Sequence, residues 1–410
     1  MHQPVGSMRG TPTTQPSSWD VVFCFSYLSW EAVAHRGWFG TEDRLARGLI
    51  EHERVGRLLV CDQMRSLPIM LARDLVEGGR IGRRRRTSPR EKEREGAFPT
   101  SPMAQLLRPV GVRREYPTSI AGVERACRAF DRAAGRRARR MGMVEPAVIV
   151  ANPLLAGFAK FEWAAEVTFF ATDDWLAYEP QRRWWRAYEE SFARVGRQKR
   201  RVGAVSAAAL ERIAPTGESK VIPNGIDPAE WLGAASRPPA WAEAAGPLLV
   251  YAGTLDSRID VDALLALARQ MPDARIVLVG PLLDAQHLEP LRATGNVDIR
   301  EPLARREVIA LIRAADVGLV PHRDNALTRA MSPLKLYEYL AAGLPVVASD
   351  LAPMRDVDAG VLLVAGGEDY AAAVEAALKR GRAREDTRNA FIARHSWRAR
   401  HDRLLDLALA

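Results

Sequence analysis

Short apolar runs that alternate with helical patterns constrain this chain more than any other feature of its sequence. Residues 20–27 (DVVFCFSY) and 55–61 (VGRLLVC) have strand character, and residues 41–52 between them have helical periodicity. Three further strand-like runs follow, at residues 147–151, 166–171 and 202–206. Strands that are apolar throughout and separated by helices form parallel sheets covered on both faces. The pattern therefore predicts an α/β fold.

The alternating pattern is interrupted once and then restarts. A Pro/Ala-rich stretch follows Asn224 and Gly225, and strand signals return at residues 248–251 and 274–280. A chain of 410 residues is long enough for two cores. We expect a disordered tail over 1–18, a Rossmann-like domain over 19–225, a linker over 226–247, a second Rossmann-like domain over 248–385, and a terminal helix over 386–410 that can pack back on the first domain.

Basic segments stand out within the first domain. Residues 80–114 hold four consecutive arginines, several prolines and an EKERE run, which predicts a mobile excursion. Residues 120–140 place apolar side chains at helical spacing with arginines between them, which predicts a basic amphipathic helix. With residues 199–201 (KRR) and a net charge of +9, these segments favour contact with an anionic membrane, and solvated arginine-rich faces are the alternative.

The composition argues against an exported or membrane-spanning protein. No apolar run approaches the ~20 residues that cross a bilayer, and the first 18 residues are polar. Cys24, Cys61 and Cys127 have neither metal-ligand nor disulfide-framework spacing, so we expect buried thiols in a reducing compartment. The sequence thus predicts a cytoplasmic protein with no metal site.

The best-defined helix lies within residues 331–350 (MSPLKLYEYLAAGLPVVASD). Ser332 suits the N-cap, Pro333 suits the first helical position, and Gly343 suits the position just past the end. These residues predict both boundaries of one helix that is followed by a buried strand.

Lys335 falls in the first turn of this helix, where the helix dipole is positive and a cation is disfavoured. A bound anion would reverse that preference, because free backbone N–H groups and the ammonium can hold a diphosphate together. Glu338, one turn later, can accept hydrogen bonds from two neighbouring hydroxyls. The alternative is a solvated pair at i, i+3 that contributes ~0.3 kcal/mol.

Three motifs in a fixed order resemble those of a known enzyme class. VIPNGID at residues 221–227, LVYAGTLDSRIDVDAL at 249–264 and SPLKLYEYLAAGLPVVAS at 332–349 are similar to the GT-B class of nucleotide-sugar-dependent glycosyltransferases, group 1-like. The resemblance implies two Rossmann-like domains that face a cleft, with the acceptor on the first and the donor on the second. It implies a nucleoside diphosphate sugar, a UDP-sugar in the first place, as substrate, with no cofactor and no metal.

The resemblance also assigns roles to residues of the second domain. Gly253 would let its loop approach the donor, Arg258 and Lys335 would neutralise the diphosphate, and Glu338 would hold the ribose. The loop over residues 321–331 would flank the base or the sugar, since ligands bind at the carboxyl ends of strands in such sheets. His322 and Met331 are weaker candidates in that loop, and packing is the alternative for both.

The chain departs from many retaining members of this class at three positions. Those members have an arginine, a lysine and a glutamate where this sequence has Thr254, Ile259 and Ala330. The sequence is closer here to the subset that includes the inverting glucuronosyltransferase-like and teichuronic-acid-type enzymes. The stereochemical course remains open at this point.

Candidates for the acceptor side lie in the first domain. Asp173 and Asp174 follow a predicted strand, and one carboxylate there can serve as the general base of an inverting transfer. Capping of the next helix is the alternative for this pair. Trp30 and His35 follow the first strand in an aromatic segment that we expect to be a loop on the acceptor side, with buried packing as the alternative.

Other protein classes fit less well. The sequence lacks the G-x-G-x-x-G of a dinucleotide-binding oxidoreductase and the G-x-x-x-x-G-K-[ST] of an NTPase. A nucleotide-sugar epimerase or phosphorylase would share the architecture and remains an alternative. A basic nucleic-acid-binding protein is a further one, although the basic segments carry no known reader motif. We therefore predict transfer of a sugar to a hydroxyl of a glycan, a lipid-linked molecule or a small molecule.

Overall fold

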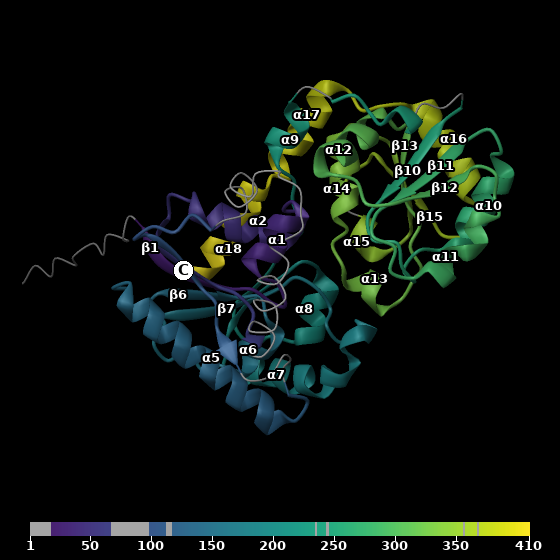
Figure 1. The fold of residues 1–410 in the computed structure, drawn as a ribbon. Coiled ribbons are helices and arrows are strands. Elements are labelled where there is room, and N and C mark those ends of the chain that lie inside the picture. Colours follow the sequence, from purple (N-terminus) through teal and green to yellow (C-terminus); the bar gives the residue numbers. More distant parts are fainter. Residues whose placement is uncertain are drawn as a thin grey trace, which may run out of the picture.

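Two α/β domains make up the protein (Figure 1). The computed structural model describes residues 18–66, 98–111, 117–233, 236–242, 246–355, 357–366 and 369–410. Nearly all of the expected tail, residues 1–17, lies outside the described residues, and so do the four arginines at 83–86. Each domain holds one parallel sheet with helices on both faces, as the apolar runs predict.

The sheet of the first domain has seven parallel strands in the order β4-β2-β1-β6-β7-β8-β9. In β1, Val22 and Cys24 belong to the core on one face of the sheet, whereas Val21 and Phe23 belong to the core on the other. Because both faces are buried, the strands read as continuous apolar runs. The strands are β1 (Trp19–Cys24), β2 (Val55–Cys61), β4 (Ala104–Leu107), β6 (Ala147–Val150), β7 (Glu166–Ala171), β8 (Arg201–Ala204) and β9 (Ser219–Val221).

Helices cover both faces of this sheet. One core includes residues of α5 (Ile120–Arg140), α6 (Pro153–Phe158), α7 (Trp185–Arg197) and α8 (Ala207–Ile213). The other includes residues of α1 (Trp30–Arg36), α2 (Thr41–Ile50) and α18 (Trp397–Ala408). The long helix α5 has the bounds that its periodicity predicts. The segment expected to be a loop after β1 is instead helix α1, which Ser29 caps.

The predicted excursion over residues 80–114 is wrong for its second half. Residues 104–107 form β4, the edge strand of the first sheet, and Ala104 is buried. The Phe98 ring packs edge-to-face on Trp30 at 4.6 Å between centroids. A short parallel pair, β3 (Arg65–Ser66) and β5 (Val110–Gly111), forms a separate two-stranded sheet. Residues 98–111 are therefore part of the first domain.

The second sheet has six parallel strands in the order β12-β11-β10-β13-β14-β15. Its strands are β10 (Leu248–Ala252), β11 (Arg275–Val279), β12 (Val297–Arg300), β13 (Val317–Val320), β14 (Val346–Ser349) and β15 (Val361–Val364). Its helices are α9 (Pro228–Leu232), α10 (Val261–Gln270), α11 (Ala285–Arg292), α12 (Arg305–Ala314), α13 (Ala326–Ala330), α14 (Leu334–Ala341), α15 (Ala352–Arg355), α16 (Tyr370–Arg380) and α17 (Glu385–Arg394).

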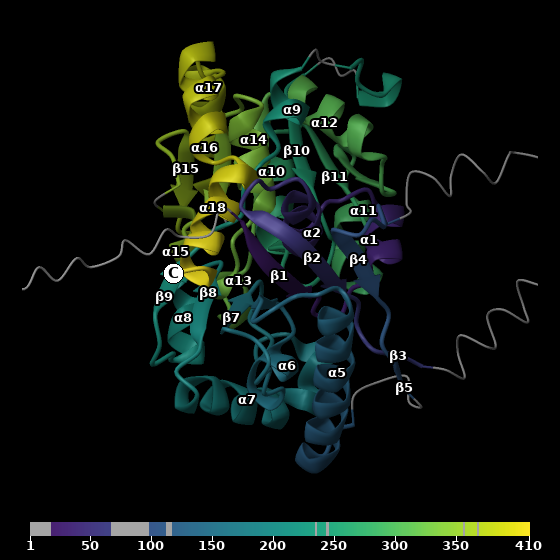
Figure 2. The same ribbon diagram turned by 90° about the vertical axis from the view of Figure 1, so that its left-hand side faces the viewer.

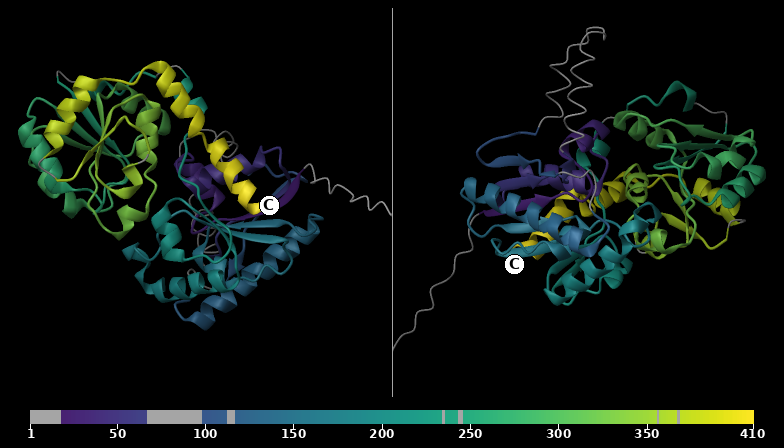
Figure 3. Two further views of the ribbon diagram at one scale, coloured as in Figure 1. Left: turned by 180° about the vertical axis from the view of Figure 1, so that it is seen from behind. Right: turned by 60° about the horizontal axis from the view of Figure 1, so that its bottom comes forward.

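The chain passes between the domains twice, and the two passages lie side by side. Ile226 on the way out accepts a hydrogen bond from Trp397 N at 2.8 Å and donates one to His395 O at 2.9 Å. Helix α17 stays with the second domain, whereas α18 returns to the first sheet, where Leu404 and Leu405 are buried (Figure 3). The last helix thus completes the core of the first domain.

Two observations bear on compartment and charge. Cys24, Cys61 and Cys127 are free and buried, as predicted. Arg200, expected in an exposed basic run, is buried and donates to Ala159 O at 2.6 Å, so that part of the prediction is wrong. None of the helices in the described part of the chain has both the length and the apolar character needed to cross a membrane.

Candidate active site

The loop after β10 comes into close contact with the first turn of α14 at Gly253. This residue has φ +153°, and a Cβ added there would lie 2.8 Å from Cε of Lys335 and 3.1 Å from its Nζ. A side chain at this position is therefore excluded both by the backbone conformation and by the lysine. Glycine brings the loop backbone beside the Lys335 ammonium.

Helix α14 begins one residue later than predicted. Pro333 is the N-cap and Leu334 the first helical residue. Ser332 does not cap the helix, because its hydroxyl accepts a hydrogen bond from Asn224 N at 3.0 Å, and Asn224 Nδ2 donates to its carbonyl at 2.6 Å. Gly343 has the predicted left-handed conformation at the other end, with φ +77°. The serine thus joins the two domains instead of ending the helix.

Lys335 is buried in the first turn of α14. Its Nζ lies 4.6 Å from the centroid of the Tyr251 ring. Burial, reinforced by the positive charge of Arg258, lowers the pKa of Lys335 to about 7. Two cations next to a helix N-terminus form a site at which a bound anion is strongly favoured.

Arg258 is held by Asp256 and by the loop that follows β13. Its Nε donates to Asp256 Oδ1 at 2.9 Å, and its Nη2 donates to Oδ2 at 2.7 Å. Its carbonyl accepts from Arg323 N at 2.8 Å. Burial disfavours the charged form of Arg258, but the effect of the Asp256 carboxylate is greater, so the pKa of Arg258 is raised. The guanidinium therefore stays charged beside Lys335.

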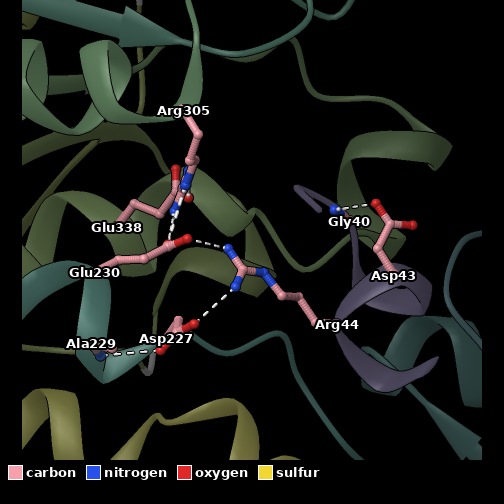
Figure 4. Close-up of polar contacts among 8 residues, drawn as sticks. All are labelled: Gly40, Asp43, Arg44, Asp227, Ala229, Glu230, Arg305 and Glu338. Atoms are coloured by element: carbon pink, nitrogen blue, oxygen red, sulfur yellow. Dashed lines mark hydrogen bonds and ion pairs between the residues drawn. The ribbon is translucent and has the colours of Figure 1, made fainter. Parts of the chain in front are cut away.

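Glu338 is also buried, and it is paired within the protein. Its Oε1 accepts from Arg305 Nη1 at 2.5 Å, and Arg305 in turn bonds Glu230 (Figure 4). Sequence reasoning missed Arg305 and Glu230, because they lie 33 and 108 residues upstream of Glu338 on other helices. The predicted i, i+3 spacing of Lys335 and Glu338 is real, but the strongest contact of Glu338 is long-range.

His322 and Met331 lie at opposite ends of the loop that follows β13. The His322 ring is buried, and its Nε2 lies 3.2 Å from the Tyr251 hydroxyl. Burial, followed by the charges of Lys335 and Arg258, holds the pKa of His322 well below its usual range. Met331 follows α13 and is half-buried. The neutral imidazole thus belongs to the same cluster as Lys335, through the shared tyrosine.

The two aspartates after β7 differ in their surroundings. Asp174 is buried, and it accepts from Leu176 N at 3.0 Å and from Arg212 Nε at 3.4 Å. Asp173 is more exposed, and its pKa is raised by burial while Arg258 of the second domain opposes that shift. Asp173 therefore interacts electrostatically with Arg258 of the second domain, whereas the Asp174 carboxylate bonds within the first domain.

A further buried carboxyl group, Glu42, lies near this turn and was missed by the sequence analysis. It accepts from Ser26 N at 2.8 Å, from Ser26 Oγ at 2.5 Å and from Thr172 Oγ1 at 3.2 Å. Burial raises its pKa to about 7. A glutamate in the first turn of α2 looks like an ordinary helix-start residue, so no local signal marks it.

The two aromatic-segment candidates lie on α1. The Trp30 ring is 3% exposed and packs on Trp38 at 4.8 Å and on Phe98. The structure therefore places Trp30 in the core, where it is not available to an acceptor. The expected loop would have left this ring exposed, but tertiary packing covers it. His35 is exposed on the same helix.

The second domain is similar to a known family of proteins. Residues 246–380 match the family model described as "Glycosyl transferases group 1". A Bacillus subtilis (strain 168) protein named "Putative teichuronic acid biosynthesis glycosyltransferase TuaH" is 34% identical over 110 residues. That match spans 26% of this chain and 27% of the relative.

Solved structures extend the likeness to the whole chain. An α,α-trehalose-phosphate synthase (UDP-forming) of Burkholderia vietnamiensis has a TM-score of 0.65 at 16% identity, covering 96% of this chain and 100% of that one. The α,α-trehalose 6-phosphate synthase of Burkholderia multivorans has a TM-score of 0.64 at 14% identity, with 96% and 98% covered. The chain therefore has the two-domain GT-B fold, and its second domain is similar to the group 1 glycosyltransferases.

Proposed function

We propose that the protein is a glycosyltransferase that moves a sugar from a nucleoside diphosphate sugar, a UDP-sugar in the first place, to an acceptor hydroxyl. The buried Lys335 carries this proposal. Burial and the charge of Arg258 disfavour the Lys335 ammonium, and Gly253 leaves the loop backbone beside it without a side chain. A diphosphate placed there would be neutralised by Lys335, Arg258 and the first N–H groups of α14.

The electrostatic interaction of Asp173 with Arg258 supports a catalytic role for this aspartate. In an inverting transfer, Asp173 accepts the proton of the acceptor hydroxyl as its oxygen forms a bond to the anomeric carbon. The bond from that carbon to the diphosphate breaks, and its electron pair leaves with the diphosphate. Lys335 and Arg258 stabilise the charge that develops there. No bound metal is needed for this step, so a chelator should leave turnover unchanged.

Nucleotide binding tests the proposal directly. Charge-assisted hydrogen bonds contribute ~1.5–3 kcal/mol each, so Lys335→Ala should weaken UDP binding roughly 10- to 100-fold. Isothermal titration calorimetry measures this change. Lys379→Ala, on an exposed position of α16, is the matched control and should bind like the wild type. Equal affinity in the two variants would remove Lys335 from the site.

We further propose that the enzyme works in the cytoplasm at an anionic membrane, where a lipid-linked acceptor would be within reach. Support comes from α5, which carries an exposed line of arginines over about four turns at one end of the first domain, away from the second domain (Figure 2). These side chains are Arg125, Arg128, Arg132, Arg136 and Arg139. Basic residues near such a surface contribute about 1 kcal/mol each.

A further inference from the structure

Glu338 is held by an arginine that also bonds a second carboxylate. Arg305, the first residue of α12, donates from Nη1 to Glu338 Oε1 at 2.5 Å. Its Nη2 and Nε donate to Glu230 Oε2 at 2.6 and 3.2 Å. One planar guanidinium thus fixes two carboxylates that lie on different helices, α14 and α9.

The other oxygen of Glu230 is bonded from the first domain. Arg44 on α2 donates from Nη2 to Glu230 Oε1 at 2.5 Å, and from Nη1 to Asp227 Oδ2 at 3.0 Å. The Phe39 ring, also of the first domain, lies 5.2 Å from Cζ of Arg305. The first domain therefore contacts Arg305 directly through Phe39. It also reaches Arg305 indirectly, through the bonds of Arg44 and Arg305 to Glu230 that Figure 4 shows.

These groups are largely withdrawn from solvent, so their contacts are not loose surface pairs. The side chains of Arg44, Arg305 and Glu338 are 8%, 14% and 9% exposed. Arg305 and Arg44 outweigh the effect of burial and lower the pKa of Glu230, while Glu338 and Glu230 outweigh burial and raise the pKa of Arg305. Glu230 and Arg305 are therefore ionised at neutral pH, and removal of one leaves the other without its charged partner.

We propose that Arg305 is a positioning residue for the donor-binding carboxylate Glu338, and that Glu230 links this position to Arg44 in the first domain. The inference rests on the proposed function, in which Glu338 holds the donor ribose. A carboxylate has about four acceptor positions, so Glu338 keeps the Arg305 bond and still accepts ribose hydroxyls. Arg305 fixes the rotamer from which it does so.

The choice of arginine follows from this geometry. Nη1 serves Glu338 while Nε and Nη2 serve Glu230, and an ammonium has no comparable fork. Arg305→Lys should therefore keep the charge but hold only one of the two carboxylates well. Arg305→Ala should release both.

The test compares UDP with 2′-deoxyuridine 5′-diphosphate, which lacks one ribose hydroxyl, by calorimetry on the full chain. The wild type should prefer UDP by about 10-fold, the value of one charge-assisted hydrogen bond. Arg305→Ala should bring the ratio of the two dissociation constants close to one, and Arg305→Lys should give an intermediate ratio. Glu230→Gln, nearly isosteric, should also lower the ratio, which covers the case in which Arg305→Ala does not fold.

A matched arginine in the same domain is the control. Arg275 pairs with Asp298 at 2.8 Å on the edge of the second sheet, so Arg275→Ala removes an ion pair without touching Glu338 and should keep the wild-type ratio. An unchanged ratio in folded Arg305→Ala and Glu230→Gln overturns the inference. A wild type that binds both nucleotides equally overturns it as well and leaves the diphosphate site intact, whereas a wild type that binds no UDP overturns the proposed function itself.

Discussion

At the scale of single residues, Lys335 couples nucleotide binding to pH. Its pKa of about 7 in the free protein means that about nine-tenths of the amines are neutral at pH 8. A diphosphate favours the ammonium, so it raises this pKa, and binding at pH 8 takes up a proton. UDP affinity should therefore fall as pH rises above about 7, by up to tenfold per unit.

Calorimetry in two buffers of different ionisation enthalpy measures that proton uptake. At pH 8 the wild type should take up close to one proton per UDP, and at pH 6 almost none. Lys335→Met, which keeps the volume of the side chain and removes its charge, should show no uptake at either pH. Uptake that persists in this variant would assign the proton to another group.

The two adjacent aspartates should separate in mutation. Asp173→Asn should slow sugar transfer by ~10²–10⁴, the usual cost of losing a general base, with UDP affinity unchanged. Asp174→Asn should instead destabilise the fold by about 1–2 kcal/mol, because the carboxylate bonds Leu176 N and Arg212. Turnover assays and urea unfolding distinguish the two outcomes. Normal turnover in Asp173→Asn would mean that another group accepts the proton of the acceptor hydroxyl.

At the scale of elements, the contact between α2 and α18 depends on one glycine. A Cβ added at Gly48 would overlap the ring of His401, which is buried on α18. Alanine gains ~1 kcal/mol in helix propensity over glycine, but overpacking of this kind costs ~1–3 kcal/mol. Gly48→Ala should therefore destabilise the first domain by about 1 kcal/mol in urea unfolding.

Gly295→Ala is the control for that measurement. A Cβ there meets nothing within 4 Å, so its effect should stay within about 0.5 kcal/mol. If Gly48→Ala were more stable than the wild type, α18 would be able to shift at no cost in stability. Its packing on α2 would then be less tight than the structure indicates.

The elements that could be predicted are those whose sequences carry a local signal. Helical periodicity predicted α5, and apolar runs predicted the central strands, because a strand that is buried on both faces consists almost entirely of apolar residues. The edge strand β12 (VDIR) is half-buried and mixed in character, so it has no such signal. Strand β4 follows an arginine-rich stretch whose composition predicts solvation, and its pairing with β2 is a tertiary effect.

The candidate site divides in the same way. Lys335, Glu338, Gly253 and Arg258 could be found because helix position and the family resemblance mark them. The bonds from Arg305 to Glu338 and from Arg44 to Glu230 span 33 and 186 residues. The first depends on how α12 packs near α14 within the second domain, and the second depends on how the two domains pack. No spacing in a sequence reports such a contact.

At the scale of the whole molecule, the arginine line on α5 should bind anionic vesicles reversibly. Replacing Arg125, Arg132 and Arg136 by glutamine removes about 3 kcal/mol of attraction, or roughly 100-fold in affinity. Co-sedimentation with anionic and with neutral vesicles measures it. Binding of the wild type should be confined to the anionic ones and lost at high salt.

A second triple variant removes the same charge from the other domain. Arg269, Lys379 and Arg394 are exposed, and their replacement by glutamine should leave vesicle binding intact. Equal losses in the two variants would mean that net charge, and not the α5 surface, drives the association. Equal binding of the wild type to neutral vesicles would leave a soluble acceptor as the simpler choice.

The double passage of the chain at Ile226 and Trp397 makes the second domain an insertion within the first. A chimera that exchanges the second domain between two proteins of this fold therefore needs two junctions. A single junction near residue 226 would also replace α18, and the incoming helix would have to fit the first sheet around Leu404 and Leu405. Recombination at both passages, where the two segments already pair, would transfer the second domain and leave the core of the first domain unchanged.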